Sequence, residues 1–199
     1  MKNFTKDFLL EFIKTIELID HSKINQIAIQ LKKVKMNHGR VFFLGVGGSA
    51  GNASHAVNDF RKICEIESYS PTDNVSELTA RINDDGWDTS YRNWLTISKL
   101  SNKDVLFIFS VGGGSKNKNV SLNLIEAIKL AKSKKCKIFG ITGPDGGYTK
   151  KNANICITIP IINKKNLTAI TESFQVIIWH ILVSHPALKK NSMKWESLI

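Results

Sequence analysis

The segment Arg40–Lys62 constrains the fold of this chain more than any other part of the sequence. It opens with a short apolar run, Val41–Leu44, which is typical of a strand buried on both faces. A glycine-rich turn follows directly, and Ser49 stands where the N-cap of a helix is expected. Strand, glycine turn and helix N-terminus together form a general anion-binding geometry, because free N–H groups and the helix dipole favour a negative charge.

The helix expected after this turn carries a histidine and a carboxylate on one face. His55 and Asp59 are four residues apart, so their side chains lie on the same side of the helix. A lone helical histidine is more often a partly buried structural residue than a ligand. A carboxylate on the same face, close to an anion-binding turn, favours a metal-binding or acid/base pair.

The rest of the chain alternates strands and helices. Strands are expected at Val41–Leu44, Asp104–Ser110, Lys137–Thr142 and Ile155–Pro160. Helices are expected at Val75–Ile82, Asp88–Leu100, Asn119–Lys132 and Asn166–Val183, with a turn at Asn83–Gly86 and no regular structure at Ile66–Asp73. This order predicts an α/β fold with a mainly parallel sheet flanked by helices. Ligands of such sheets bind beyond the carboxyl ends of the strands, where a second glycine loop, Val111–Ser115, follows the second strand.

Two amphipathic helices are expected before the first strand. Phe4, Phe8, Phe12 and Ile16 recur at helical spacing, and Ser22 is the expected cap of the second helix. We therefore divide the chain into an N-terminal helical unit, residues 1–38, and a main domain, residues 39–199. The apolar stripes of the first unit favour packing on the domain and a role in oligomerisation.

Composition sets further limits on function. The chain has 199 residues, a hydrophobic share of 42% and a net charge of +11. The lysines are scattered, so a solvated basic surface is favoured over nucleic-acid binding. The three cysteines show no metal-binding spacing. Neither a signal-like leader nor an apolar run of membrane-spanning length is evident, so no membrane association and a cytoplasmic location are expected.

The order of the motifs resembles the SIS (sugar isomerase) domain, and within it the phosphoheptose isomerases. The motifs are Gly45-x-Gly-Gly-Ser, the His55/Asp59 helix, Asn83-Asp-x-Gly, Ser110-Val-Gly-Gly-Gly-Ser and Thr142-Gly-Pro-Asp-Gly-Gly. The resemblance implies a three-layer SIS fold with an N-terminal helical extension. It also implies an aldose–ketose isomerase that converts sedoheptulose 7-phosphate to D-glycero-D-manno-heptose 7-phosphate through an enediol, in bacterial heptose synthesis for lipopolysaccharide or capsule. Members of this family are typically homotetramers with sites at subunit interfaces.

The resemblance also implies a phosphate site. The family loop usually reads Ser-Thr-Ser-Gly-Asn-Ser, whereas here Val111 and Gly112 replace the inner Thr and Ser. Two hydroxyl donors are lost, so backbone N–H groups or Lys116 would have to compensate, and the exact sugar stays open. The implied substrate-binding residues are Gly47, Gly48, Ser49, Asn83, Asp84, Ser110, Gly112, Gly113, Gly114, Ser115 and Glu172.

The metal and catalytic residues of the family map onto two pairs. Its His-x-x-x-Glu corresponds to His55 and Asp59, and its Gln and His, eight residues apart, correspond to Glu172 and His180. All four are zinc ligand types, so the resemblance implies Zn²⁺. It also implies that Asp59 is the base and His180 the partner acid/base, although a carboxylate bound tightly to a metal is a poor base. Eight helical residues rise ~12 Å, so Glu172 and His180 share a ligand only if it lies between them.

Two alternatives follow from the departures in the sequence. The changed phosphate loop and the shorter Asp59 would fit a non-catalytic SIS protein that senses phosphosugars or binds a replication initiator. They would also fit an isomerase of a different phosphosugar. The retained metal-type residues favour catalysis, because a binding module has no need of them.

Overall fold

A computed structural model of the chain describes residues 3–194, so the outermost ends of both predicted units, 1–2 and 195–199, lie outside the described residues. The strands are β1 (Val41–Leu44), β2 (Ser68–Tyr69), β3 (Val105–Ser110), β4 (Lys137–Thr142) and β5 (Ile155–Thr158). The helices are α1 (Phe4–Leu18), α2 (His21–Met36), α3 (Gly48–Cys64), α4 (Val75–Asp85), α5 (Ser90–Ile97), α6 (Leu122–Ser133), α7 (Gly147–Asn152) and α8 (Leu167–Ser184), with a 3₁₀ turn at Lys164–Asn166.

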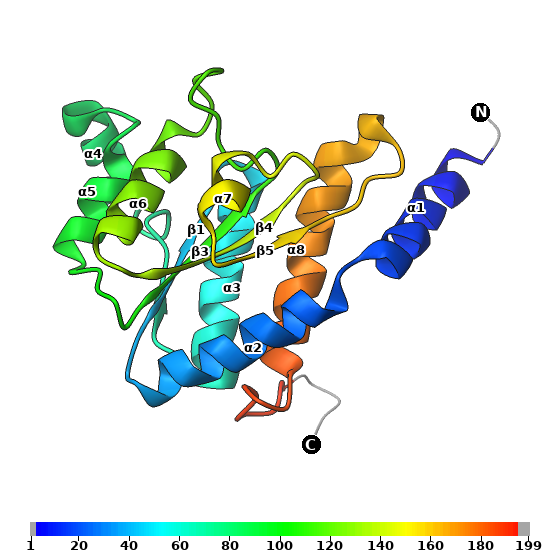
Figure 1. Ribbon diagram of the computed structural model, residues 1–199, viewed down its shortest axis with the longest axis horizontal. Coiled ribbons are helices and arrows are strands. Elements are labelled where there is room, and N and C mark those ends of the chain that lie inside the picture. The colour runs from blue at the N-terminus through cyan, green and yellow to red at the C-terminus, as the bar shows by residue number, and fades with distance from the viewer. Residues whose placement is uncertain (1–2, 195–199) are drawn as a thin grey trace.

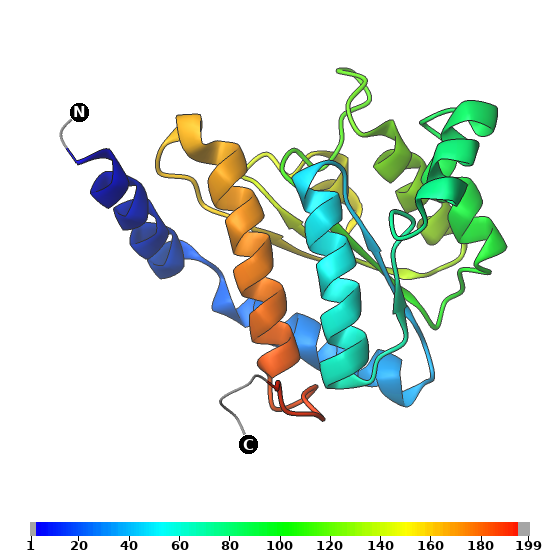
Figure 2. The same ribbon diagram turned by 180° about the vertical axis from the view of Figure 1, so that it is seen from behind.

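The five strands of the described chain form one parallel sheet in the order β2-β1-β3-β4-β5. Helices α2, α3 and α8 contribute to the core on one face, and α4 to α7 lie on the other (Figures 1 and 2). This is the expected α/β architecture with three layers. The first strand and Lys137–Thr142 have the predicted bounds, because each is a wholly or almost wholly buried apolar run.

Alternate residues of the central strands supply the two cores. Phe107 and Phe109 of β3 face α3 and α8, whereas Leu106 and Ile108 face α5 and α6. The first core contains a cluster of aromatic side chains, in which Trp179 of α8 stacks on Phe109 at 6.3 Å. Helices α3 and α8 therefore pack side by side on one face of the sheet, and both begin at the edge where the strands end (Figure 2).

The N-terminal helices behave differently from each other. Helix α2 is part of the core through Ile24, Ile27 and Leu31. Helix α1 projects from the body and touches it through Phe12, whose ring stacks on Phe174 at 5.6 Å (Figure 1). The expected cap of α2, Ser22, is wrong: Asp20 is the N-cap, and its carboxylate accepts the N–H groups of Ser22 and Lys23.

Other local predictions need correction. The segment Ile66–Asp73 contains the short strand β2, and α7, which begins at Gly147, was not among the expected helices. The first three residues of the predicted turn Asn83–Gly86 instead complete α4, which ends with Gly86 as its C-cap. The segment Lys164–Ser184 is long and apolar enough to span a membrane by length and composition, contrary to expectation, but its apolar face packs into the core.

Candidate active site

The first glycine turn, Gly45–Ser49 (turn one), links β1 to α3. Gly47 is the N-cap, with φ 63°, and Ser49 lies inside the first turn of the helix rather than at the predicted cap position. The hydroxyl of Tyr91 donates to the carbonyl of Gly45 at 2.7 Å. Burial raises the pKa of Tyr91 to about 12, so the phenol stays protonated and fixes the base of the turn.

A carboxylate of the chain itself occupies the start of α3. Ser49 Oγ donates to Glu172 Oε1 at 3.4 Å, and a methyl group added to Gly48 would lie 2.4 Å from Glu172 Oε2. Asn52 Nδ2 donates to the carbonyl of Glu172 at 3.0 Å, which fixes α8 against α3. The negative charge that the N-terminus of a helix favours is thus supplied by Glu172.

Gln175 completes this network, although the sequence analysis did not single it out. Its side chain is fully buried, donates to Ser49 Oγ at 3.1 Å and accepts from Asn52 Nδ2 at 2.9 Å. Its position three residues after Glu172 puts both on one helix face, and this spacing is the signal that would have found it.

About two helical turns further along, α3 and α8 bring three predicted residues together. Asp59 Oδ2 lies 3.7 Å from His55 Nε2 and 3.5 Å from His180 Nε2. The side chain of Asp59 is 11% exposed, whereas those of His55 and His180 are about half exposed, at 56% and 42%. The cluster thus has a buried carboxylate at its base and two imidazoles that face outward.

The carboxylate of Asp59 is held by neighbouring donors. The indole Nε1 of Trp179 donates to Asp59 Oδ2 at 3.1 Å, and Asn58 Nδ2 donates to Oδ1 at 3.0 Å. His180 Nδ1 lies 2.9 Å from the carbonyl of Val176, which can only accept, so Nδ1 carries a hydrogen, and in the neutral ring Nε2 presents a lone pair. The sequence analysis did not single out Trp179, because no local pattern reveals a bond across 120 residues.

The donor set of this cluster fits a divalent metal ion. Its three ligand atoms all lie within 4.8 Å of one another. Tetrahedral zinc with bonds of about 2.0–2.1 Å separates neighbouring ligand atoms by roughly 3.3 Å, close to the two His–Asp distances. The bonds from Trp179 and to Val176 are outer contacts of the kind that orient metal ligands. Glu172 is not in this group, because its carboxylate lies at Gly48 and Ser49.

The second glycine loop, Ser110–Ser115 (turn two), links β3 to a hairpin and α6. Ser110 Oγ accepts from the N–H of Gly113 at 3.0 Å, and Ser115 pairs through its backbone with Val120 to close the hairpin. The carbonyls of Gly113 and Gly114 accept the N–H groups of Thr149 and Tyr148 in α7. The N–H groups of Gly112 and Gly114 donate to no group within residues 3–194.

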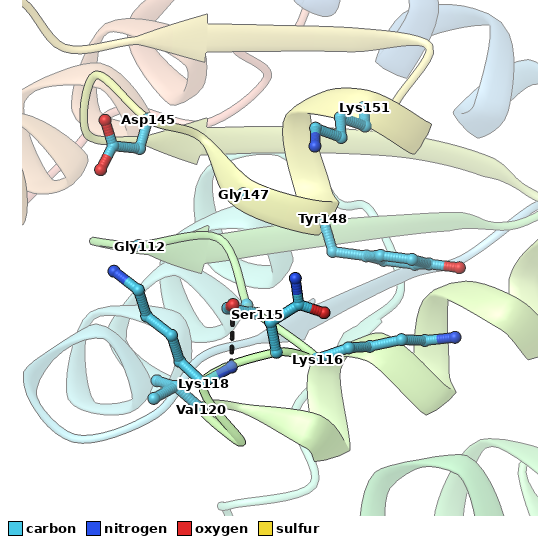
Figure 3. A pocket seen from close by; sticks show the side chains of 11 residues that line it. Gly112, Ser115, Lys116, Lys118, Val120, Asp145, Gly147, Tyr148 and Lys151 are labelled. Carbon is cyan, nitrogen blue, oxygen red and sulfur yellow. Dashed lines mark hydrogen bonds between the residues drawn. The ribbon is translucent and has the colours of Figure 1, made fainter.

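A pocket of about 620 Å³ opens beside turn two (Figure 3). Its walls are the loop and hairpin on one side and the α7 segment on the other, and it is lined by Gly112, Gly114, Ser115, Lys116, Asn117, Lys118, Val120, Asp145, Gly147, Tyr148 and Lys151. The lining does not include His55, Asp59 or His180. Within one chain, the pocket and the metal-type cluster are therefore separate.

The remaining predicted residues lie elsewhere. Asn83 and Asp84 are exposed at the end of α4, where the amide of Asn83 donates to Asp84 at 2.8 Å. Helix α4 packs on the face of the sheet opposite α3 and α8. The structure thus groups the site residues in two regions, turn one with the α3–α8 cluster and turn two with its pocket, and leaves Asn83 and Asp84 apart from both.

A comparison with known families agrees with this architecture. The family model described as "SIS domain" matches residues 6–143. The chain belongs to the SIS domain family. Its fold, a five-stranded parallel sheet between helices, is the SIS fold expected from the sequence.

Individual SIS proteins narrow the comparison. The phosphoheptose isomerase of Buchnera aphidicola is 32% identical over 156 residues, which cover 76% of each chain. The lincomycin biosynthesis protein LmbN of Streptomyces lincolnensis is 34% identical over 158 residues, which are 74% of this chain but 56% of LmbN. Among solved structures, the phosphoheptose isomerase of Neisseria gonorrhoeae superposes with a TM-score of 0.79 at 25% identity, covering 90% of this chain and 95% of that one.

Proposed function

We propose that this SIS protein is an aldose–ketose isomerase that converts sedoheptulose 7-phosphate to D-glycero-D-manno-heptose 7-phosphate. The observation that carries the proposal is the buried Asp59 carboxylate between two outward-facing histidines. Relatives named phosphoheptose isomerase support this reaction over a purely regulatory role. A sensor or a binder of a replication initiator would have no use for such a cluster.

The reaction moves one proton between adjacent carbons through a cis-enediol. It requires a base at the carbon, a proton source at the carbonyl oxygen and stabilisation of the enediolate. In our proposal Asp59 takes the proton from carbon, because Trp179 and Asn58 hold its carboxylate in one orientation. His180 exchanges the proton at oxygen through Nε2, since its Nδ1–H is committed to Val176.

We further propose that His55, Asp59 and His180 hold a zinc ion. Three protein ligands with an open fourth position are the arrangement of catalytic zinc sites. The ion would supply Lewis-acid polarisation of the carbonyl and hydroxyl oxygens. Asp59 and His180 then each have two competing roles, because the Asp59 carboxylate would be base or ligand and His180 Nε2 would be proton exchanger or ligand. Glu172 is proposed to act on the substrate or on the metal from its position at turn one, two helical turns before His180.

The remaining predicted residues are proposed to bind the phosphosugar, turn two at the phosphate and turn one at the sugar. Gly47, Gly48 and Ser49 of turn one and the Ser110–Ser115 loop lie at the same edge of the sheet, beyond the strand ends. Asn83 and Asp84, which are exposed at the end of α4, are proposed to bind sugar hydroxyls.

We also propose that the protein is a homotetramer with sites at subunit interfaces. Helix α1 exposes large apolar side chains, and a contiguous apolar face of this kind marks an interaction surface. They are Phe4, Leu9, Leu10, Ile13, Ile16 and Leu18, each 40–69% exposed. A cytoplasmic location and a product used for lipopolysaccharide or capsule complete the proposal. Light scattering tests the assembly, and a monomer would contradict it.

A different phosphosugar is the second candidate. Turn two has Val111 and Gly112 where hydroxyl donors are usual in the family, and one relative at 34% identity is named for lincomycin synthesis. The substrate of this chain is therefore tested directly. Purified protein is incubated with sedoheptulose 7-phosphate, with and without Zn²⁺, and followed by proton NMR. We expect an aldose phosphate to form, faster with zinc. Binding without turnover would contradict the proposed reaction.

A further inference from the structure

The positive charge of the chain is concentrated in three segments that each run from a helix into a central strand. They are residues 21–41, 90–105 and 127–142, which lead into β1, β3 and β4. They contain 13 of the 28 lysines and arginines but one of the 17 acids, so they account for the net charge of +11. The excess of positive charge, which is scattered along the sequence, thus belongs to one kind of connection.

The parallel sheet brings these three connections to one edge. Val41, Val105 and Lys137 are paired in register across β1, β3 and β4, so the loops before them lie side by side. Helices α2, α5 and α6 also end there, and the C-terminus of a helix favours positive side chains. This is the amino edge of the sheet, opposite the edge where turn one and turn two stand. Its exposed lysines, which we call the basic edge, are Lys32, Lys33, Lys99, Lys103, Lys132, Lys134, Lys135 and Lys137.

The lysines of the basic edge form no ion pair with an acid within residues 3–194. The acid of the three segments, Asp104, is buried and lies 2.9 Å from the guanidinium of Arg40. The charge of the eight lysines is therefore uncompensated on the surface. A surface with so much charge of one sign attracts polyanions.

A half-buried cluster fixes the three loops to one another. The guanidinium of Arg40 donates to the carbonyls of Ser98 and Lys99 at 2.9 and 3.0 Å. It also donates to the carboxylate of Asp104, whose carbonyl accepts from the thiol of Cys136 at 3.2 Å. The lysines therefore stand on an ordered backbone, which lowers the entropy lost when a partner binds.

The basic edge also lies away from the other proposed interaction surfaces. Turn one and turn two stand at the carboxyl ends of the strands, at the other edge of the sheet. Helix α2 ends on the side of the molecule opposite α1, the helix proposed to join subunits (Figure 1). The edge thus stays accessible when the sugar site is filled and when subunits assemble through α1.

The lysines of the basic edge span the three layers of the fold. Lys32 and Lys33 belong to α2 on one face of the sheet, and Lys132 and Lys134 stand at the end of α6 on the other. With about 10 Å between packed layers, the two groups are roughly 20 Å apart. This separation lets them reach phosphates on both sides of a major groove, which is about 12 Å wide.

Two other polyanionic partners fit this edge less well. Single-stranded nucleic acid is bound by stacking of its bases on aromatic rings, and residues 37–40, 98–104 and 134–136 contain no Phe, Trp or Tyr. A helix that lies on a membrane inserts a continuous apolar face. The exposed apolar side chains here, Met36 and Ile97, end α2 and α5 on opposite faces of the sheet and form no such face.

We propose that the basic edge binds double-stranded DNA through its phosphate backbone, without reading the base sequence. Ammonium groups are compact point charges that pair with phosphates and release the counterions of the duplex. The proposal goes beyond the isomerase reaction and does not depend on it, because the basic edge includes neither glycine turn nor the α3–α8 cluster.

The test compares pairs of adjacent exposed lysines in the full chain. Lys134→Gln/Lys135→Gln removes two charges from the basic edge. The matched control, Lys164→Gln/Lys165→Gln, removes two charges from the 3₁₀ turn before α8, at the opposite edge. Fluorescence anisotropy follows the binding of a labelled duplex of about 30 base pairs and mixed sequence, at about 50 to 200 mM salt. We expect the basic-edge variant to lower the slope of log affinity against log salt by about 1.8, and the affinity at about 100 mM salt by about tenfold. The control should match the wild type.

A second pair and other polyanions make the outcome decisive. Lys32→Gln/Lys33→Gln changes the basic edge on the other face of the sheet and should weaken DNA binding to a similar extent, with urea unfolding as the check that each variant is folded. No binding of the duplex by the wild type at about 50 mM salt, or equal losses in the control, would overturn the proposal. Tighter binding of a single strand, an RNA duplex or phosphatidylserine vesicles than of duplex DNA would overturn the choice of partner.

Discussion

Turn one and turn two share a local pattern and differ in what distant segments bring to them. Each follows a buried strand, is rich in glycine and stands at the same edge of the sheet. Turn one meets α8, which contributes Glu172 and Gln175 from more than 120 positions away. Turn two meets α7 and a lysine hairpin. A strand–glycine–helix pattern thus does not by itself identify where an external anion binds.

The comparison predicts that the two regions have different functions. The α3–α8 cluster beside turn one contains groups that can move protons or hold a metal, whereas the pocket at turn two contains fixed positive charge. Variants in the first region should act on kcat and metal binding. Variants in the second region should act on KM and on the affinity for phosphate.

The largest effect is expected for Asp59→Asn. The amide keeps one oxygen that can face a metal but cannot act as a base, so kcat should fall by about 100- to 10,000-fold, the usual share of general acid–base catalysis. Kinetics with sedoheptulose 7-phosphate and zinc content by atomic absorption are measured together. Lost activity with retained zinc assigns Asp59 as the base, and loss of both assigns it as a ligand. Full activity would exclude both roles.

The sequence predicts the architecture better than the contacts of the site. The strand runs are apolar and bounded by turns, and the four-residue spacing of His55 and Asp59 fixes a shared helix face. Both features are local, and the structure contains both. The carboxylate of Glu172 at Gly48 and the bond from Trp179 to Asp59 depend on how α8 lies against α3. No local pattern encodes that alignment.

The local predictions that were wrong, at Asn83–Gly86 and Ser49, have a similar cause. The sequence of Asn83–Gly86 predicts a turn, but α4 extends through Asp85. Arg81 contacts Glu77 one turn before it and Asp85 one turn after it. Ser49 reads as a cap, but its hydroxyl is used by Glu172 and Gln175. In both places, contacts between side chains outweigh the intrinsic conformational preference of the residues.

Gly48→Ala should give the next largest effect and test whether turn one is closed. The added methyl would lie 2.4 Å from Glu172 Oε2, at the end of a flexible side chain that can move aside, so we expect a loss of about 1 kcal/mol in the free energy of unfolding. Gly112→Ala at turn two has no atom within 4 Å of the added methyl and should change it by less than about 0.5 kcal/mol. Urea unfolding measures both.

A double variant identifies the cause of the Gly48 effect. Glu172→Ala removes the carboxylate that the methyl would strike, so Gly48→Ala/Glu172→Ala should recover most of the stability lost in Gly48→Ala, relative to Glu172→Ala alone. Additive losses would mean that Glu172 does not occupy the start of α3. The distinction between a closed and an open turn would then fail.

The smallest effect is expected for Trp179→Phe, which tests whether the hydrogen bond from Trp179 orients Asp59 in the metal-type cluster. Phenylalanine keeps an aromatic ring in the core but cannot donate to Asp59, so zinc affinity should fall about tenfold, as for other outer contacts of metal ligands. Phe109→Leu is the control, because it disturbs the ring stacked on Trp179 and leaves the indole N–H in place. Competition with a chelator measures zinc affinity in both variants below their unfolding temperatures. A tenfold loss of zinc affinity confined to Trp179→Phe supports a positioning role for the indole N–H. Equal losses in both variants would mean that Trp179 acts only through packing in the core.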